Sequence, residues 1–595
     1  GSTTVICTDK TGTLTRNEMT VVQFYTAKSR YTIKGRGYDP TIKGITEKYS
    51  KKEVPLKKLV ENTGIKNAFS CAALCNNSQI SKEKNGWEAI GDPTCSASAT
   101  FGWKTIGSSE EYKKNNPRIH EFFFDAERKR MTTINEVNGV NWAFTKGALG
   151  PMESILTKIY DGDEVIDLTE EHLKQIREAN VSMASSALRV LALAGKKIND
   201  GTDIENINQV ESELVFLGLI GIRDPPRSEA YEAIATCHEA GIRVIMITGD
   251  QEHTAKSVGI ELEICDEDSE TISGYQLSGI DDHKLIDIVE HVNIFCRVTP
   301  DQKMRIVQAL QKRGEVVAMT GDGVNDAPAL SSANIGIAMG ISGTDVARDA
   351  ADMILQDDNF ANIVHAVEEG RKIYWNIRNF VRYQVSTNVA AVLVLILSSF
   401  VFQWDDLPLT ATQILVINIL MDGPPAVALG MEKNHGTVMS RAPRPVTEGL
   451  PNLIDTVLIA FLGTLMAIGT LAVYSTVKGQ ASIEEAVTAT FAVFVMFQLF
   501  NVMNCRSIDK SIFKLGLLSN KAVVYSFVIC TTLLVCIIEY SHYQVPIIGL
   551  NIGEFLSVQQ FTIKYTWPVI VLLASSVLIF EEFRKFFMKN TKIFN

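Results

Sequence analysis

Three segments of the sequence each end a run of apolar, β-prone residues in an aspartate. They are residues 5–9, 244–250 and 316–322, which end in Asp9, Asp250 and Asp322. Amphipathic stretches of helical period, such as residues 301–311, lie between the last two segments. Strands that alternate with helices predict a parallel α/β sheet, which binds its ligand at the carboxyl ends of the strands. We therefore expect a site built on carboxylates at that edge of the sheet.

Asp9 has the surroundings that a nucleophilic carboxylate needs. It opens the segment Asp-Lys-Thr-Gly-Thr-Leu-Thr at residues 9–15, and a carboxylate at a strand end can attack phosphorus to form an acyl phosphate. That reaction requires groups that neutralise the charge of the phosphate. The candidates are Lys303 in the helical stretch, the backbone amides around Gly12 and the hydroxyl of Thr11.

Two further carboxylates are spaced to bind a metal ion. Asp322 and Asp326 lie in the segment Thr-Gly-Asp-Gly-Val-Asn-Asp at residues 320–326, and Mg²⁺ prefers carboxylate, phosphate and water oxygens. A single Gly-Asp-Gly turn would indicate only a loop. The interpretation therefore depends on the three segments occurring together.

The chain divides into a charged part and an apolar part. Its 595 residues are too many for one hydrophobic core, and charged residues are frequent only up to about residue 382. Residues 21–208 have strands of their own, so we interpret them as a domain inserted into one formed by residues 1–20 and 209–375. The net charge of −11 argues against a nucleic-acid partner. The ten cysteines show no paired CxxC spacing, which indicates buried, reduced thiols.

The apolar part, residues 376–595, predicts an all-α membrane domain. Its apolar runs are long enough to cross a hydrocarbon layer of ~30 Å. The six candidate spans are approximately residues 378–402, 410–431, 453–476, 486–505, 521–541 and 565–582. Lysine and arginine gather in alternate connections, so the positive-inside rule places those connections and the charged part in the cytoplasm.

The second candidate span contains a charged residue inside an apolar run. A carboxylate such as Asp422 costs ~2.5–3.5 kcal/mol to insert, so it is a candidate functional residue. Asn418 shares a helix face with it, and Gly423 with the two prolines that follow disrupts the helix and frees backbone carbonyls. With Asn388 in the first span, these oxygens suit a hard cation such as Ca²⁺. Either asparagine alone could instead make a hydrogen bond between helices.

Together, residues 9–15, 248–250 and 320–326 resemble the signature motifs of the P-type ATPases, in the same order. The resemblance implies an α/β haloacid-dehalogenase-like phosphorylation domain with an inserted α+β nucleotide-binding domain, followed by the six membrane helices. It also implies that ATP phosphorylates Asp9 and that Asp9, Thr11 and Asp322 hold Mg²⁺. The residues implied to act at the phosphate or nucleotide are Thr11, Thr248, Gly249, Asp250, Arg297, Lys303, Asn325 and Asp326, with Arg227 in the hinge motif at residues 224–227.

The resemblance places the adenine pocket in the inserted domain. Phe124 is implied to stack on the base, while Lys129 and Lys146 meet its polar edge and the phosphates. Each of these residues could also be ordinary surface or core. Two residues depart from the family pattern, because Cys95 replaces a glutamate and Ala126 replaces an arginine. We therefore expect the chain to bind nucleotide more weakly or through a different set of contacts.

The same resemblance points to calcium pumps with a single calcium site. Ala391 and Gln498 stand where the two-site reticulum-type pumps have glutamates, which favours the secretory-pathway and plasma-membrane types and one Ca²⁺ per ATP. Met421 beside Asp422 fits the secretory-pathway type, some members of which carry Mn²⁺. The sequence leaves manganese open as the transported ion.

The family has an actuator domain and four membrane helices before the phosphorylation motif, and the sequence starts eight residues before Asp9. We expect the chain to be the C-terminal half of a pump and unable to turn over alone. Two alternatives remain, a membrane-anchored aspartate-dependent phosphatase and a catalytically silent binding partner. The inserted domain and Asp422 argue against the first, and the intact phosphorylation motifs against the second.

Overall fold

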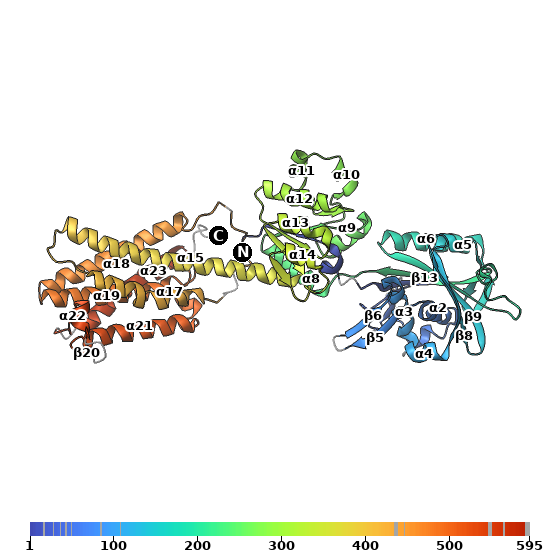
Figure 1. Cartoon of the computed structure of the whole chain (residues 1–595), viewed down its shortest axis with the longest axis horizontal. Coiled ribbons are helices and arrows are strands. Elements are labelled where there is room, and N and C mark those ends of the chain that lie inside the picture. The colour runs from blue at the N-terminus through green and yellow to red at the C-terminus, as the bar shows by residue number, and fades with distance from the viewer. Residues whose placement is uncertain are drawn as a thin grey trace. The chain divides into compact units, whose positions relative to one another are not determined.

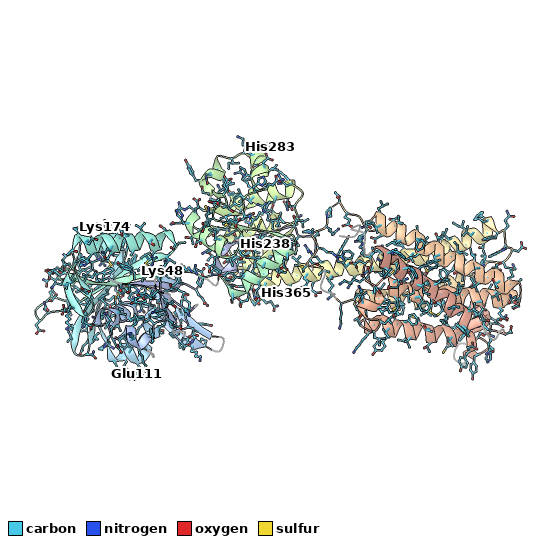
Figure 2. All side chains as sticks on the ribbon, turned by 180° about the vertical axis from the view of Figure 1, so that it is seen from behind. Lys48, Glu111, Lys174, His238, His283 and His365 are labelled. Carbon is cyan, nitrogen blue, oxygen red and sulfur yellow. The ribbon has the colours of Figure 1, made fainter. Side chains whose placement is uncertain are left out.

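The computed structural model describes residues 1–588 apart from short segments (Figure 1). The residues left out are 16–17, 28, 36, 42–43, 49, 51, 84–85, 107–108, 434–437, 446, 546–549, 563–565 and 589–595. The chain forms two compact units, one of Thr4–His238 with Arg243–Ile363, and one of Gly1–Thr3, Glu239–Ile242 and Val364–Asn595. Figure 2 shows charged side chains such as Lys174 and Glu111 on the outside of the first unit, as expected for the charged part of the sequence.

A seven-stranded sheet forms the first part of the larger unit. Its order is β15-β16-β14-β1-β17-β18-β19, and all neighbouring strands are parallel. The three predicted strands are β1 (Val5–Thr8), β14 (Arg243–Ile247) and β17 (Val317–Gly321). The remaining strands are β15 (Thr271–Ser273), β16 (Ile294–Cys296), β18 (Ile335–Met339) and β19 (Met353–Leu355). β1 is therefore the central strand, and its neighbours are the two strands that carry the other motifs.

The predicted helix after Pro300 is α12 (Pro300–Lys312). It begins with a capping box, in which Gln302 accepts a hydrogen bond from the backbone amide of Thr299, and with proline at its first position. Its buried face includes Lys303 as well as apolar residues. The other helices of this part are α8 (Ser228–Glu239), α9 (Glu252–Glu261), α10 (Gly274–Ser278), α11 (Asp282–Ile288), α13 (Ala327–Ser332) and α14 (Asp345–Ala350).

A ten-stranded, mainly antiparallel sheet forms the second part of this unit, with the path β4-β3-β2-β13-β12-β9-β8-β7 and with β10 and β11 attached at β13. Its strands are β2 (Thr20–Tyr25), β3 (Arg30–Ile33), β4 (Ile45–Glu47), β7 (Arg118–Asp125), β8 (Arg130–Val137), β9 (Val140–Gly147), β10 (Leu156–Asp161), β11 (Glu164–Asp167), β12 (Arg189–Lys197) and β13 (Leu214–Arg223). The main helices are α2 (Thr63–Leu74), α3 (Pro93–Ile106) and α6 (Glu170–Ser185).

The predicted end of the inserted domain at residue 208 is wrong. β13 pairs with β2 and β12 inside the second sheet, so this sheet continues to Arg223. From the sequence alone, the apolar run that forms β13 could be a strand of either sheet. Only its pairing with partners far away in the chain assigns it to the second sheet.

The second unit contains six helices, among the residues described, that are long and apolar enough to cross a membrane. They span Ala361–Val401, Ala411–Gly430, Leu453–Lys478 (α18), Ile483–Asn504 (α19), Lys521–Glu539 (α21) and Thr566–Phe587 (within α23, Thr566–Met588). The number of spans agrees with the prediction. The first helix, α15 (Ala361–Ile396), begins well before the predicted residue 378, because its charged first turns carry no hydropathy signal yet contain no proline to interrupt them.

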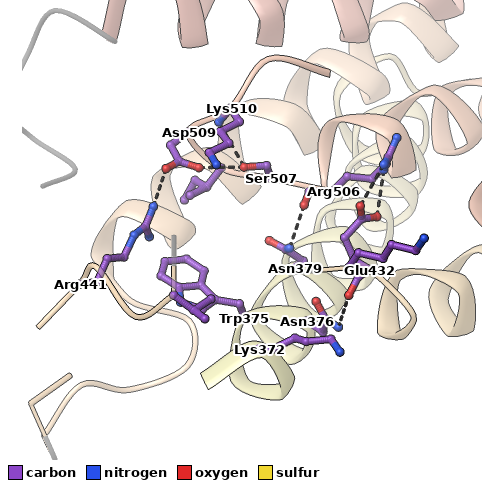
Figure 3. Close-up of a pocket in the computed structure, with 13 residues that line it drawn as sticks. Lys372, Trp375, Asn376, Asn379, Glu432, Arg441, Arg506, Ser507, Asp509 and Lys510 are labelled. Atoms are coloured by element: carbon purple, nitrogen blue, oxygen red, sulfur yellow. Dashed lines mark hydrogen bonds and ion pairs between the residues drawn. The ribbon is translucent and has the colours of Figure 1, made fainter. Parts of the chain in front are cut away.

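A buried polar network ties the connections between the membrane helices to α15 (Figure 3). Arg506, just after α19, makes two bonds of 2.9 Å to the carboxylate of Glu432, which also accepts a bond from Asn520. Asn376 and Asn379 on α15 donate to the backbone carbonyls of Glu432 and Arg506 respectively. The Arg506 side chain is completely buried. The network around this ion pair therefore links three parts of the chain: helix α15, the segment after α17 that contains Glu432, and the connection that contains Arg506 and Asn520.

Candidate functional site

The order of the parallel strands brings the sequence motifs to one edge of the sheet. β1 lies between β14 and β17, so the loops after these strands are neighbours. Asp9 follows β1, Thr248 follows β14, and Asp322 follows β17. The backbone amide of Asp9 donates to the hydroxyl of Thr320 at the end of β17, at 3.2 Å. The expected site is therefore assembled at the carboxyl ends of the strands.

Lys303 joins two carboxylates of the site. Its Nζ donates to Oδ2 of Asp9 at 2.6 Å and to Oδ1 of Asp326 at 2.7 Å. The second carboxylate oxygen of Asp326 accepts the backbone amides of Asp322 and Gly323, at 3.2 and 3.1 Å. Asp326 thus accepts three hydrogen bonds from the protein and positions Lys303. The other oxygen of Asp9, Oδ1, accepts the backbone amide of Lys10 at 2.6 Å.

The charges of this cluster are strongly coupled because they are mostly buried. Burial raises the pKa of Asp9, and the ammonium group of Lys303 only partly offsets that effect. Burial alone would lower the pKa of Lys303, but the carboxylates of Asp9 and Asp326 outweigh it and raise this pKa. Lys303 therefore stays protonated and supplies a fixed positive charge beside Asp9.

The loop after Asp9 is held by its backbone. Gly12 has φ of +76°, a conformation that favours glycine. The guanidinium group of Arg227 donates to the carbonyls of Gly12 and Thr15 at 3.0 and 3.2 Å. Arg227 was expected at the phosphate or nucleotide. In this structure it contacts the backbone of the loop.

Sequence reasoning did not identify a role for Lys10. Its Nζ makes an ion pair of 2.6 Å with Asp250, which was expected to contact phosphate. The amide of Asp250 donates to the hydroxyl of the buried Thr248 at 3.2 Å. The sequence shows a lysine directly after the proposed nucleophile, but it does not show the partner of that lysine. Asp250 lies 240 positions away, and the two residues meet only because β1 pairs with β14.

The remaining predicted phosphate residues lie around the same edge. Gly249 leaves open space where a Cβ would stand. Asn325 and Arg297 have exposed side chains, and the amide of Arg297 donates to the carbonyl of Asp250. Thr11 is half-buried in the loop after Asp9. Thr11 lies in the loop after β1, Gly249 and Asp250 in the loop after β14, and Asn325 in the loop after β17.

The donor set at this edge fits a magnesium ion. A Cβ on Gly12 would come within 3.0 Å of Oδ2 of Asp322, so this carboxylate lies against the loop after Asp9. Burial and the nearby carboxylates of Asp9 and Asp326 raise the pKa of Asp322 to about 6. A cation between Asp9 and Asp322 would relieve that repulsion. Both oxygens of Asp326, which the sequence suggested as a second ligand, accept hydrogen bonds from the protein, as do both oxygens of Asp9.

The predicted adenine pocket lies on the second sheet. Phe124 at the end of β7 is 65% exposed, so its ring is free to stack. Lys129 is exposed in the turn between β7 and β8, whereas Lys146 on β9 is buried. Lys146 donates to the sulfur of Cys95 at 3.1 Å. Cys95, which the resemblance places where the family has a glutamate, therefore lies beside Lys146.

A buried carboxylate that sequence reasoning missed fixes the neighbouring turn. Glu211 pairs with Arg128 at 2.5 Å and with Arg130 at 2.6 Å. It also accepts a hydrogen bond from the hydroxyl of Thr132 at 2.8 Å. Both arginines close to Ala126 are consequently engaged by Glu211. The sequence carried no signal for this contact, because Glu211 lies about eighty residues further along the chain.

The helix of the second span is interrupted at Asp422, as predicted. Helix α16 (Ala411–Val416) passes through a π-helical turn (Ile417–Met421) into α17 (Gly423–Gly430). Pro424 and Pro425 have no amide hydrogen to offer the carbonyls of Leu420 and Met421. The thiol of Cys530 on α21 approaches both carbonyls, at 3.8 and 3.7 Å.

The three predicted ion ligands differ in burial. Asp422 is 1% exposed, and its Oδ1 accepts the hydroxyl of Tyr383 on α15 at 3.0 Å. Its Oδ2 is buried and accepts no hydrogen bond from the described residues. Asn388 and Asn418 have exposed side chains in the described part of the chain. A buried carboxylate oxygen without a donor fits a cation ligand.

Comparison with known proteins follows the division seen in the structure. The family described as P-type ATPase, cytoplasmic domain N, matches residues 64–229, which include seven of the ten strands of the second sheet. The family described as cation transporting ATPase, C-terminus, matches residues 406–587 in the membrane-capable helices. With the site around Asp9, these matches show that the chain belongs to the P-type ATPases.

Among P-type ATPases, the chain is similar to calcium-transporting members. It is 37% identical over 585 residues to a calcium-transporting ATPase of Bacillus subtilis and 41% identical over 614 residues to calcium-transporting ATPase 1 of Schizosaccharomyces pombe. It is 38% identical over 532 residues to the human calcium-transporting ATPase type 2C member 2. These alignments cover 97%, 99% and 88% of this chain.

The chain spans less than two thirds of these relatives, namely 64%, 63% and 54% of their lengths. The family and the six apolar helices among the described residues make it a multi-pass integral membrane protein.

Proposed function

We propose that this chain forms the phosphorylation site, the nucleotide site and part of the ion site of an ATP-driven Ca²⁺ pump that moves one Ca²⁺ per ATP. The observation that carries the proposal is the contact of Lys303 with both Asp9 and Asp326 at the central strand of a parallel sheet. The names of the similar proteins support calcium as the transported ion.

In the proposed reaction, an oxygen of Asp9 attacks the γ-phosphorus of ATP, and the bond from that phosphorus to the oxygen of ADP breaks. The product is an acyl phosphate on Asp9. Lys303 offsets the negative charge of the phosphoryl group, and the amides around Gly12 donate to its oxygens. A haloacid-dehalogenase-like fold of the seven-stranded sheet is part of this proposal, supported by the parallel order around β1.

Asp322, with Asp9 and Thr11, is proposed to hold Mg²⁺, which neutralises phosphate charge when bound. Asp326 keeps Lys303 in place. Thr248, Gly249 and the amides of the following loop line the remaining side of the phosphate.

The nucleotide is proposed to bind on the second sheet. The exposed ring of Phe124 offers a stacking surface for adenine. Lys146 lies on β9, and Gly147 follows it where a Cβ would collide with Arg130. The close approach of these backbones explains why glycine follows the lysine.

The transported ion is proposed to bind at Asp422. Its buried, unsatisfied oxygen and the interrupted helix next to it provide oxygen ligands, to which Asn388 and Asn418 add theirs. The N-terminal half of a pump is the proposed partner that completes the site. The lipid bilayer surrounds the six helices.

The test is ATP-dependent uptake of radioactive calcium and manganese into sealed vesicles that contain this chain together with an N-terminal half. Calcium uptake is the expected result, and uptake of manganese alone would change the ion assignment. Phosphorylated Asp9 without uptake of either ion would show that the ion site is misassigned. A chain that releases phosphate from small phosphoesters and forms no phosphoenzyme from ATP would instead be a phosphatase.

A further inference from the structure

The predicted nucleotide pocket contains a thiol in contact with an ammonium group. Cys95 lies in the first turn of α3, where Asp92 caps the helix by accepting the amides of Thr94 and Cys95 at 2.9 and 3.0 Å. The Nζ of Lys146 donates to the Cys95 sulfur at 3.1 Å. Reactive cysteines are found beside lysines and at the first turns of helices, and Cys95 has both neighbours.

Lys146 contacts this thiol and has no acidic partner among the described residues. Its side chain is 5% exposed, and it makes no ion pair with a carboxylate among the described residues. Its hydrogen bond goes to Cys95. A buried ammonium group is costly unless an anionic or polar group compensates it. The Cys95 sulfur is therefore the group that compensates the ammonium of Lys146 among the described residues.

Cys95 also differs from the other cysteines in its access to water. Eight of the ten cysteines are buried, and the exposed Cys536 lies on α21, a candidate membrane span. Cys71 and Cys75 are close to Lys146 but buried, and burial raises the pKa of both thiols. Cys95, which is partly exposed, is consequently the accessible thiol of the cytoplasmic part of the chain.

We propose that Cys95 is a modification site at which a small-molecule disulfide controls access to the nucleotide pocket. The Cys95 thiolate attacks one sulfur of the disulfide, a new S–S bond forms, the original S–S bond breaks, and the departing thiolate takes up a proton. The attached group adds bulk beside Lys146, which lies 3.1 Å from the Cys95 sulfur. The identity of the blocked ligand as ATP rests on the proposed function, whereas the reactivity of Cys95 does not.

The first experiment measures the reaction rate of each cysteine with oxidised glutathione in the detergent-solubilised full chain, using peptide mass spectrometry. Cys95 is expected to react at least tenfold faster than Cys71 and Cys75. Lys146→Met is expected to slow the reaction at Cys95 about tenfold, while Lys146→Arg, which keeps the charge, largely preserves it. Equal rates at the three cysteines, or a rate at Cys95 that both variants leave unchanged, would overturn the proposal.

The second experiment measures binding of a fluorescent ATP analogue before and after glutathione treatment. Treatment is expected to weaken binding at least tenfold in the wild-type chain, dithiothreitol to restore it, and Cys95→Ser to abolish the effect of treatment. If binding of the analogue stays unchanged after complete modification of Cys95, the proposal that this modification controls access to the nucleotide pocket is wrong. If the untreated chain binds no analogue while Cys95 reacts in a Lys146-dependent manner, the nucleotide assignment fails and the modification site is supported.

Discussion

The ammonium group of Lys303 lies 2.6 Å from the carboxylate of Asp9, although the two residues are 294 positions apart in the chain. Helix α12 carries the lysine to the carboxyl end of β1, and Asp326 anchors it from the other side. A fixed positive charge thus stands next to the atom proposed to receive phosphate.

Replacing Lys303 by methionine is expected to slow phosphorylation of Asp9 by ATP about 10²–10³-fold, because the developing phosphate charge loses a buried cation. The measurement is the rate of phosphoenzyme formation in a pump completed with its N-terminal half. Lys312→Met on the exposed side of α12 is the matched control. Equal rates for both variants would contradict the role of Lys303.

Replacing Asp9 by asparagine is expected to abolish acyl-phosphate formation and to leave nucleotide binding in place. The amide cannot act as the nucleophile, while the proposed adenine pocket lies on the other sheet. The measurement is hydroxylamine-sensitive labelling from radioactive ATP, with binding of a fluorescent ATP analogue as the control. Label retained in the variant would assign the nucleophile to another residue.

Magnesium dependence should change with pH around the pKa of Asp322. Burial and neighbouring carboxylates raise this pKa to about 6, so the group is ionised at pH 7 and protonated at pH 5. Protons then compete with the cation, and the apparent Mg²⁺ affinity is expected to fall by up to about tenfold per pH unit below 6. Calorimetric titration from pH 5 to 7.5 measures this. Asp322→Asn should bind weakly throughout, and a wild-type affinity that stays constant down to pH 5 would contradict the assignment.

Replacing Asp422 by asparagine is expected to abolish the calcium dependence of phosphorylation by ATP in the completed pump, because the buried anionic ligand is lost. Tyr383→Phe removes the hydrogen bond to Oδ1 and should shift calcium affinity while preserving phosphorylation. The measurement is phosphoenzyme level against free calcium, with the exposed Asp405→Asn as control. Unchanged calcium dependence in Asp422→Asn would place the ion site elsewhere.

Replacing Arg506 by methionine is expected to destabilise the membrane domain by about 3–5 kcal/mol, because the Glu432 carboxylate stays buried without its partner. The double variant Arg506→Met with Glu432→Leu should recover much of this loss, since neither charge then remains. Thermal unfolding of the detergent-solubilised chain measures both. Two single variants whose effects simply add in the double variant would show that the pair is not coupled.

The local sequence was sufficient for the parts of the fold that local patterns encode. The three β-prone runs, the helix after Pro300 and the number of membrane-capable helices were all predicted, because side-chain periodicity and hydropathy act within a few neighbouring residues. The end of the second sheet was placed too early. β13 has the same apolar pattern as a strand of the first sheet, and its pairing partners are remote.

By itself, the sequence determined which residues could do chemistry, since Asp9, Asp322 and Asp422 stand in contiguous segments whose residue types limit their roles. Only the tertiary structure decided which charges meet. In the fold, Lys10 makes an ion pair with Asp250, and Glu211 makes ion pairs with Arg128 and Arg130. Lys146 donates a hydrogen bond to Cys95. Contacts of this kind depend on strand order and helix packing, which bring together residues separated by dozens to hundreds of positions.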